Sequence, residues 1–525
     1  MSSFRPKRCL PAKDRQLRAW RVVFLLFSLS LVSSPGLPQA ASQTGATKPA
    51  NSGQGGEAFP KARLDKILAI PATEQSILFV RVRDGKSLYE REPDSSVSPA
   101  SVTKLFTTAA VLAKFGPAGT LSTKFFHTGT RNGGVVTGDL VVVGDGDPFV
   151  ISEKLWQLAA DMRHLGYEEF TGDIVVDDSL FAGPVRDESR RTGERKSENA
   201  YDAPVSAFGV NFNTLAIAVA PGNGAGKPAR VGIDPYNVRG VTIDNNAKTT
   251  SGGGDAAVQA TRFGADDTPR ISVGGNVPLS APIRKIYRSV SDPLAISGEY
   301  LRAFLEGAGI KVRGRVRAGK LPAGATPVIA LEGYEMRRIA QGLNTFSNNY
   351  IADTLVKRLG ARFSPQGGKA DAAGSGTFDA GIRVMTSFLR DEVGIKSKFT
   401  LLNGSGLATG NRFSARDVVG LLLYMESRMD LYPEFLGSLP AYGWDGTVKK
   451  RGRRDLAMLA GQVRAKTGTL SEPISVAGLG GYFRHAQHGL VAFAMLDNGR
   501  TGKPQLGIGD LRSRQDEVLA EIFSN

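Results

Sequence analysis

The chain has 525 residues, of which 41% are hydrophobic and 22% are charged, and its formal net charge is +16 at pH 7. Because a single hydrophobic core stops growing at about 250 to 300 residues, this length predicts two or three domains rather than one. The only cysteine, Cys9, lies in a segment that we expect to be removed, which excludes disulfide bonds, cysteine nucleophiles and zinc–thiolate sites from the mature chain.

The first 41 residues predict an export signal. Seven Lys and Arg residues precede the apolar run at 22–32 (VVFLLFSLSLV), and the small residues Ala40 and Ala41 follow it. The run is shorter than the roughly 20 residues that a membrane-spanning helix needs. We therefore expect a signal peptide over 1–41 that is cleaved near Ala40, with an uncleaved anchor as the alternative.

The charge balance favours an anionic partner. Residues 1–40 hold seven basic residues and one Asp, so the rest of the chain keeps a net charge of +10. An exported basic protein fits the cell wall or a membrane surface better than nucleic acid, so we expect no nucleic-acid partner. A solvated basic surface without a particular partner is an equal alternative.

Secondary-structure signals begin after a linker. Residues 42–58 are rich in Gly, Ser, Thr and Ala, and we expect the folded part to start near Phe59. The stretch 75–83 runs into an Asp-Gly turn and then into 86–89, which predicts a β-hairpin. A broad apolar face at helical spacing predicts a helix over 99–115.

The next part of the chain predicts a small α/β unit in two pieces. The first piece reads as a strand at 140–143, a helix at 155–165 and a strand at 174–176. The second piece reads as a helix at 294–309 followed by a strand at 310–316. These two pieces are expected to pack together as one unit.

Between the two pieces, residues 186–290 are Gly-rich and short-stranded, which predicts a β-rich inserted module. After this region the signals alternate between helices, turns and strands. They predict helices at 336–359 and 415–428, a turn-rich segment at 402–414, strands at 463–470, 474–483 and 489–497, and a closing helix at 510–523.

The pair Ser101 and Lys104 forms the only S-x-x-K sequence in the chain and lies at the start of the predicted helix. Residues three apart are neighbours on a helix face, so the serine hydroxyl and the lysine amine can meet. A serine nucleophile needs a base, and a lysine serves as one only when burial or nearby cations lower its pKa. By itself the motif is weak evidence for a catalytic pair, because a helix that begins with a capping serine and has a surface lysine one turn later has the same sequence pattern.

Two further motifs change this assessment. An S-x-N sequence occupies 347–349, before a helical segment, and K-T-G-T occupies 466–469, in a predicted strand. A second serine can shuttle the proton of the base, a strand lysine and threonine can bind a carboxylate, and a glycine lets substrate backbone approach a strand edge. The candidate site residues are thus Ser101, Lys104, Ser347, Asn349, Lys466, Thr467, Gly468 and Thr469.

Other catalytic mechanisms have less support in the sequence. The four histidines of the chain lie in no Ser-His-Asp setting. His485 and His488 spell H-x-x-H, but no third ligand lies nearby, so we expect a solvated hairpin tip rather than a metal site. Ser405 is flanked directly by glycines, which is not the spacing of a nucleophile elbow. We expect neither a metal nor a cofactor.

Together, the three motifs resemble those of the penicillin-binding protein 4 type of D-alanyl-D-alanine carboxypeptidase/endopeptidase, the class C low-molecular-mass penicillin-binding proteins. The resemblance extends over about 60–525 and includes YDAPVSAFGVNFNT at 201–214 and DGTVKKR at 445–451. A long insertion between the first and second motifs is a mark of this group. The chain departs from the family pattern at Asn403, where an aspartate is common.

The resemblance implies an α/β (α+β) fold. A penicillin-binding-protein/β-lactamase-like transpeptidase domain, with an antiparallel sheet and flanking helices, would be interrupted by a small α/β domain that carries a β-rich insert. The expected parts are the signal peptide at 1–41, the linker at 42–58, the transpeptidase-like domain at 59–120 and 331–525, the small α/β domain at 121–185 and 291–330, and the β-rich domain at 186–290.

The resemblance also implies an activity and a role for each site residue. An exported, periplasmic enzyme would hydrolyse D-Ala-D-Ala ends and cross-links of peptidoglycan peptides through a penicillin-sensitive acyl-enzyme. A β-lactamase or esterase, or an inactive wall-binding protein, is the alternative. Lys104 would deprotonate Ser101, Ser347 would link Lys104 with Lys466, Asn349 would hold the peptide, Lys466 and Thr467 would hold the terminal carboxylate, and the backbone N–H groups of Ser101 and Thr469 would form the oxyanion hole.

Overall fold

The computed structural model describes residues 58–190, 198–263, 269–364, 371–451 and 454–524. The predicted export signal at 1–41 and nearly all of the predicted linker at 42–58 lie outside these residues. Within the described ranges, no helix has both the length and the apolar character that crossing a membrane requires.

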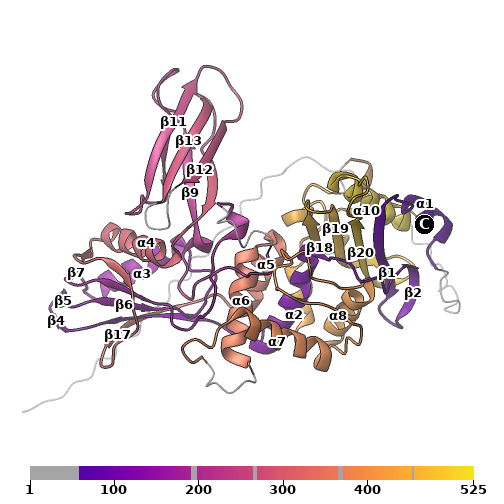
Figure 1. Ribbon diagram of the computed structural model, residues 1–525, viewed down its shortest axis with the longest axis horizontal. Helices are drawn as coiled ribbons and strands as arrows, with labels where there is room; N and C mark the ends of the chain where they lie inside the picture. Colours follow the sequence, from indigo (N-terminus) through magenta and orange to yellow (C-terminus); the bar gives the residue numbers. More distant parts are fainter. Residues whose placement is uncertain (1–57, 191–197, 264–268, 365–370, 452–453, 525) are drawn as a thin grey trace, which may run out of the picture. The chain divides into compact units, whose positions relative to one another are not determined.

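A five-stranded antiparallel sheet is built from both ends of the described chain (Figure 1). Its strands lie in the order β18-β19-β20-β1-β2, and β1 pairs with β20 over nine residues of each strand. The bounds are β1 (Thr73–Arg81), β2 (Lys86–Arg91), β18 (Val463–Leu470), β19 (Val476–His485) and β20 (Gly489–Gly499). Strand β18 is at the edge, so one side of its backbone is left outside the sheet pairing.

Alternating side chains on these strands feed two cores, because successive residues of a strand point to opposite faces. On β1, Leu78 and Val80 join a cluster with helices α2 (Lys104–Phe115) and α8 (Ala415–Ser427). Ile77 and Phe79 join the opposite cluster, with α1 (Lys61–Ile67) and α10 (Ile508–Phe523). The sheet is thus covered by helices on both faces, and the predicted hairpin at its N-terminal end is confirmed.

The helix predicted over 336–359 is two helices, so that prediction was wrong at its centre. Ser347 has φ 55° and ψ 38°, in the left-handed region, and ends α5. Asn348 then caps α6, because its side chain accepts a hydrogen bond from the backbone of Ile351 at 3.1 Å. The helices of this region are α5 (Met336–Phe346), α6 (Asn349–Phe363), α7 (Phe378–Ser387), a π-helix (Phe388–Glu392) and α9 (Tyr432–Ser438).

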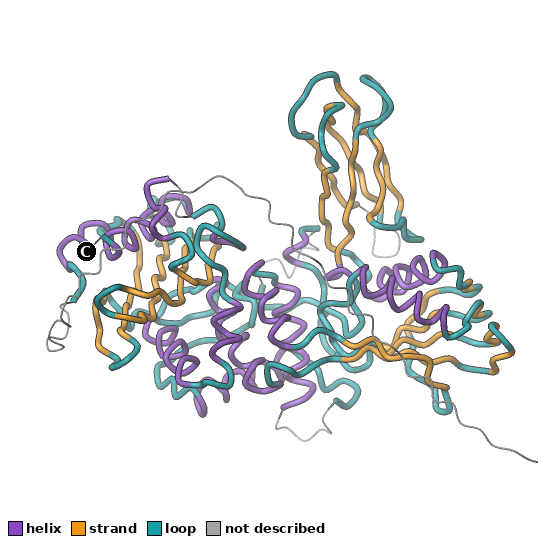
Figure 2. The backbone as a smooth tube through the Cα atoms, turned by 180° about the vertical axis from the view of Figure 1, so that it is seen from behind, coloured by secondary structure: helices purple, strands orange, loops and turns teal. Residues whose placement is uncertain are grey.

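A mixed sheet, β16-β8-β6-β3-β17, is packed against α3 (Ser152–His164) and α4 (Pro293–Gly307), as Figure 2 also shows from behind. The predicted strand at 310–316 is divided between two sheets, because Gly314 lies against the backbone of Gly172 and the chain changes sheet there. The strands are β3 (Ser122–His127), β6 (Leu140–Val143), β8 (Ile174–Asp177), β16 (Val316–Ala318) and β17 (Thr326–Glu332), with β4 (Thr130–Asn132), β5 (Val135–Thr137), β7 (Glu169–Phe170) and β15 (Lys311–Val312) in the second sheet.

Two three-stranded sheets account for the β-rich region. One has the order β10-β9-β14 and the other β11-β13-β12. Their strands are β9 (Thr214–Ala220), β10 (Arg230–Asp234), β11 (Thr242–Thr250), β12 (Ala257–Phe263), β13 (Arg270–Pro278) and β14 (Arg284–Ser289). A single hydrophobic cluster includes residues of this region and of the α/β unit. The boundaries between the expected domains therefore stay a prediction.

The prediction of a solvated tip at His485 and His488 was wrong. Both side chains are buried, and their rings stack at 4.8 Å between centroids. Phe59 packs on both rings, and the Nε2 atom of His485 is 3.2 Å from the backbone carbonyl of Ile522 on α10. Within the described ranges, no group of three His, Cys, Asp or Glu side chains is placed to hold a metal ion.

Candidate active site

The site is built around a tight turn that carries Ser101. The helix predicted over 99–115 begins with a 3₁₀ turn, η1 (Ala100–Thr103), and becomes α-helical only at Lys104. Ala100 has φ 46°, which is costly for a residue with a side chain and is found where the surrounding structure enforces it. The backbone next to the candidate nucleophile is therefore held in one strained conformation.

Glycines on two other segments make room for this turn. At Gly468 of β18, a Cβ atom would collide with the backbone carbonyl of Pro99. Gly406 has φ 74°, and a Cβ there would collide with the carbonyl of Ala100. The sequence predicts that Gly468 admits substrate, but the close approach seen at this position is that of the Ser101 turn itself.

Lys104 is fully buried, and its Nζ atom lies 3.0 Å from the Oγ atom of Ser101. The same nitrogen donates to Asn349 Oδ1 at 2.7 Å and to the backbone carbonyl of Ser405 at 2.5 Å. A neutral amine has two N–H donors and one lone pair. With two partners that only accept, the lone pair is left for Ser101, the one neighbour that can donate a proton.

Burial lowers the pKa of Lys104 well below the ordinary lysine value, and the nearby cation Arg190 lowers it further. Arg190 is itself buried and pairs with Asp202 at 2.8 Å and with Asp353. The environment therefore favours the neutral amine at Lys104, which is the form that accepts a proton.

A second lysine–serine pair lies on the other side of the site. Lys466 is buried on β18 and donates to the Oγ atom of Ser347 at 2.7 Å and to the carbonyl of Thr467 at 2.7 Å. Burial and the neighbouring Lys104 lower the pKa of Lys466. In the described part of the chain, Ser347 is bonded to Lys466 and no direct hydrogen bond joins it to Lys104.

Asn403 organises the loop that holds Lys104. Its side-chain oxygen accepts from the backbone N–H of Gly406 at 2.8 Å, and its amide donates to Ser189 Oγ at 3.0 Å. The loop presents the Ser405 carbonyl to Lys104. The amide at this position thus supports the site through hydrogen bonds that need no negative charge.

The predicted residues converge on one cleft, of about 610 Å³. Ser101, Ser347, Asn349, Thr467 and Thr469 line it, while Lys104, Lys466 and Gly468 lie behind its surface.

Among the lining residues that the sequence did not predict, three contact the predicted ones. Arg512, on α10, donates to Thr469 Oγ1 at 2.6 Å, and Thr447 accepts from Thr467 Oγ1 at 2.8 Å. The backbone carbonyl of Tyr201 accepts from the Asn349 amide at 2.9 Å. Tyr201 and Thr447 fall in segments that carry the family resemblance, so the sequence could have identified them. Arg512 lies in an ordinary amphipathic helix, and no sequence motif marks it as a site residue.

Comparison with known proteins identifies the family of this chain. The sequence profile of the D-Ala-D-Ala carboxypeptidase 3 (S13) family matches residues 61–519. A D-alanyl-D-alanine carboxypeptidase of Actinomadura sp. (strain R39) is 32% identical over 468 residues, which cover 85% of this chain and 82% of that protein. The family resemblance inferred from the motifs is confirmed.

Solved structures share the fold. Penicillin-binding protein 4 of Haemophilus influenzae gives a TM-score of 0.69 at 20% identity, over 88% of this chain and 99% of that one, and it has also been solved with a β-lactam. A predatory endopeptidase of Bdellovibrio bacteriovorus, in complex with an immunity protein, gives 0.52 at 15% identity, over 86% and 94%. The expected α/β class, with an antiparallel sheet flanked by helices, is confirmed.

Proposed function

This chain belongs to the D-Ala-D-Ala carboxypeptidase 3 (S13) family of serine carboxypeptidases, and we propose that it hydrolyses peptidoglycan stem peptides ending in D-Ala-D-Ala through an acyl-enzyme on Ser101. One observation carries the proposal. The Nζ atom of the buried Lys104 lies 3.0 Å from Ser101 Oγ, in an environment that keeps its pKa low.

In the acylation step, Ser101 Oγ attacks the carbonyl carbon of the penultimate D-Ala, and Lys104 takes the hydroxyl proton. The C–N bond breaks, and the terminal D-Ala leaves as an amine after it receives a proton. Ser347, bonded to Lys466 at 2.7 Å, delivers that proton and is reprotonated by the proton that Lys104 took, so Lys104 is neutral again when water enters. Water then adds to the acyl carbon, the ester bond breaks, and Ser101 recovers its proton.

The scissile peptide aligns along the edge strand β18. Because β18 ends the sheet and the segment 440–442 is bonded to it only as far as Ala465, the outer edge beyond Ala465 has backbone groups for an extended peptide, as in other cases of strand addition. Asn349 lines the opposite side of the cleft and holds the peptide there. The backbone N–H groups of Ser101 and Thr469 stabilise the negative charge that develops on the carbonyl oxygen.

The terminal carboxylate binds where hydroxyl groups and a cation meet. Thr467 and Thr469 line the cleft, and Arg512 contacts Thr469 and lines it as well. Lys466 adds positive potential from behind the surface. Arg512 therefore joins Lys466 and Thr467 in the proposed carboxylate site, because a guanidinium in partly dehydrated surroundings binds a carboxylate strongly.

The proposal includes three further properties. The enzyme is exported to the periplasm, in line with the N-terminal sequence pattern. Penicillin and other β-lactams acylate Ser101, as the name and the β-lactam complex of the Haemophilus protein suggest. It also cleaves D-Ala-containing cross-links, an activity named for the Bdellovibrio protein of the same fold.

The test uses the purified chain with a fluorescent penicillin and with diacetyl-Lys-D-Ala-D-Ala. We expect a covalently labelled band and release of D-Ala, and both disappear in Ser101→Ala. A folded wild-type protein that neither becomes labelled nor releases D-Ala would overturn the proposal. Rapid loss of the label by hydrolysis, without D-Ala release, would instead indicate a β-lactamase.

A further inference from the structure

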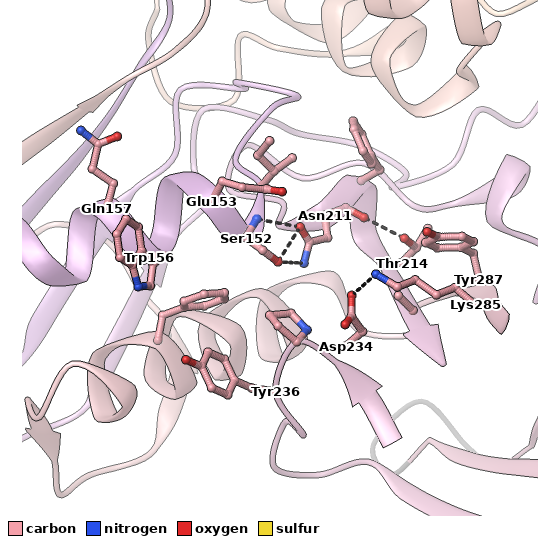
Figure 3. Close-up of a pocket in the computed structure, with 15 residues that line it drawn as sticks. Ser152, Glu153, Trp156, Gln157, Asn211, Thr214, Asp234, Tyr236, Lys285 and Tyr287 are labelled. Atoms are coloured by element: carbon pink, nitrogen blue, oxygen red, sulfur yellow. Dashed lines mark hydrogen bonds and ion pairs between the residues drawn. The ribbon is translucent and has the colours of Figure 1, made fainter. Parts of the chain in front are cut away.

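A second cavity, of about 840 Å³, shares no lining residue with the cleft (Figure 3). We call it the Trp156 cavity. Helix α3, the turn at 211–213, the end of β10 and strand β14 form its walls. Its main side chains are those of Ser152, Trp156, Asn211, Tyr236, Lys285 and Tyr287.

Three large aromatic side chains of this cavity are exposed. The exposed fraction is 65% for Trp156, 49% for Tyr287 and 38% for Tyr236. They come from three different elements, and Figure 3 shows them around the same space. Aromatic rings gathered at an open cavity mark a binding surface, because they offer a large apolar face at a low entropic cost.

The polar groups of the cavity suit an uncharged ligand. Lys285 is paired with Asp234 at 2.7 Å, and the other ionised lining residue is Glu153. No surplus cation is therefore available for a phosphate or a carboxylate. Trp156 and Gln157 line the cavity and are exposed, so the indole N–H and both functions of the amide are accessible to a ligand.

The cavity continues into a second one, of about 250 Å³, and both are lined by Trp156, Tyr236 and Phe304. The Tyr236 and Phe304 rings meet edge to face at 5.0 Å between centroids. The shared aromatic group thus separates two adjoining compartments. Two compartments on either side of aromatic rings fit a chain of repeating units better than a single small molecule.

A short path joins the Trp156 cavity to the proposed peptide site. Phe212 lines the cavity, and its ring lies 6.1 Å from that of Tyr350, the residue after Asn349. Three consecutive residues, Asn211 to Asn213, have φ between 50° and 59°. Ser152 fixes this turn, because its backbone N–H donates to Asn211 Oδ1 at 2.9 Å. Such strain in bulky residues persists where a site requires it.

We propose that the Trp156 cavity binds the glycan strand of peptidoglycan, a chain of neutral N-acetylated amino sugars from which the stem peptide branches. The sugar faces stack on the exposed aromatic rings, and their hydroxyl and acetamido groups bond to the accessible indole and amide. This inference rests on the proposed function, since it assigns to one substrate both the peptide in the cleft and the sugar in the cavity. A fully extended stem of five residues reaches about 17 Å, which is the largest separation that one substrate could bridge between the sugar and the end of its peptide.

Sugar binding is tested separately from catalysis, on the full chain carrying Ser101→Ala. The probe is the N-acetylglucosamine trimer, which has no peptide, and binding is measured by titration calorimetry. We expect saturable binding that weakens about tenfold in Trp156→Ala and in Tyr287→Ala. Met429→Ala is the control, because it removes an apolar side chain that is 84% exposed outside the cavity, and it should bind like the parent protein. All variants are compared by thermal unfolding.

Absence of trimer binding, or equal affinity in Trp156→Ala and the parent, overturns the proposal. A second measurement compares kcat/KM for a muropeptide that retains its disaccharide with that for the free stem peptide. In an otherwise wild-type chain, Trp156→Ala should lower the ratio of kcat/KM for the muropeptide to kcat/KM for the free stem peptide about tenfold. An unchanged ratio also overturns the inference. If no peptide is hydrolysed by the wild type, the proposed function fails, while trimer binding by the Ser101→Ala protein still decides the sugar site.

Discussion

The proposed catalytic cleft and the Trp156 cavity differ in how far their polar and aromatic side chains are exposed. In the cleft, Lys104 and Lys466 have no exposed surface, and each is bonded to a serine on another segment or turn. In the Trp156 cavity, the indole of Trp156 is 65% exposed. Nucleophilic attack by a serine requires a base that is shielded from water and held in a fixed position. Binding of a ligand requires side chains that are exposed to it.

The largest effect should come from removing the base. Lys104→Met keeps the length and packing of the side chain but cannot accept a proton, so acylation should slow about 10⁴-fold. Labelling kinetics with a fluorescent penicillin measure this rate. Lys114→Met, at the exposed end of the same helix, is the matched control and should be labelled at the normal rate. If Lys104→Met kept a tenth of the rate, the cleft would owe its reactivity to something other than this lysine.

The pH profile tests whether burial of Lys104 matters. Its pKa is lowered, so the neutral, proton-accepting form appears at a lower pH than for an ordinary lysine with a pKa of 10.5. We expect kcat/KM to rise about tenfold per pH unit on the acid side and to level off well before pH 10.5. A rate that kept rising to pH 10.5 would show that the lysine behaves as if it were solvated.

A mutation that adds a single methyl group tests whether the position of the Ser101 turn is fixed. Gly468→Ala places a Cβ against the Pro99 carbonyl, so the Ser101 turn must shift; we expect about 10²-fold lower kcat and a loss of about 1 to 3 kcal/mol in the free energy of unfolding. Gly420→Ala is the control, because no atom beyond the adjacent backbone of α8 lies within 4 Å of its added Cβ. It should raise stability by about 1 kcal/mol and leave kcat unchanged. Equal behaviour of the two variants would mean that the turn is not tightly constrained.

The smallest effect concerns recognition within the cleft. Arg512→Gln keeps a donor for Thr469 but removes the charge, so KM for a peptide with a free terminal carboxylate should rise about tenfold. The same peptide with an amide-capped end should show no such change. Arg514→Gln, an exposed neighbour on α10, serves as the control. An equal loss on both peptides would place Arg512 in a structural role.

Periodicity explains why some elements were predicted closely and others were not. Strand β18 coincides with the predicted 463–470. Helix α8 was likewise placed within one residue. The apolar pattern of 336–359 continues across Ser347, so periodicity alone did not show that the helix is interrupted by a left-handed residue there. His485 and His488 looked like a polar turn because the segments that cover them are distant in the sequence.

The sequence by itself determined the family, the order of the three motifs and the motif residues that gather at the cleft, since these depend on the local sequence and its periodicity. Only the tertiary structure decided which partners each residue has. It shows that Lys104 is hydrogen-bonded to Asn349 and to the Ser405 carbonyl, and that Ser347 is bonded to Lys466 and not directly to Lys104. It also shows the contact of Arg512 with Thr469 and the presence of the Trp156 cavity. These contacts link segments far apart along the chain, and their energies depend on burial and close approach, which no local pattern encodes.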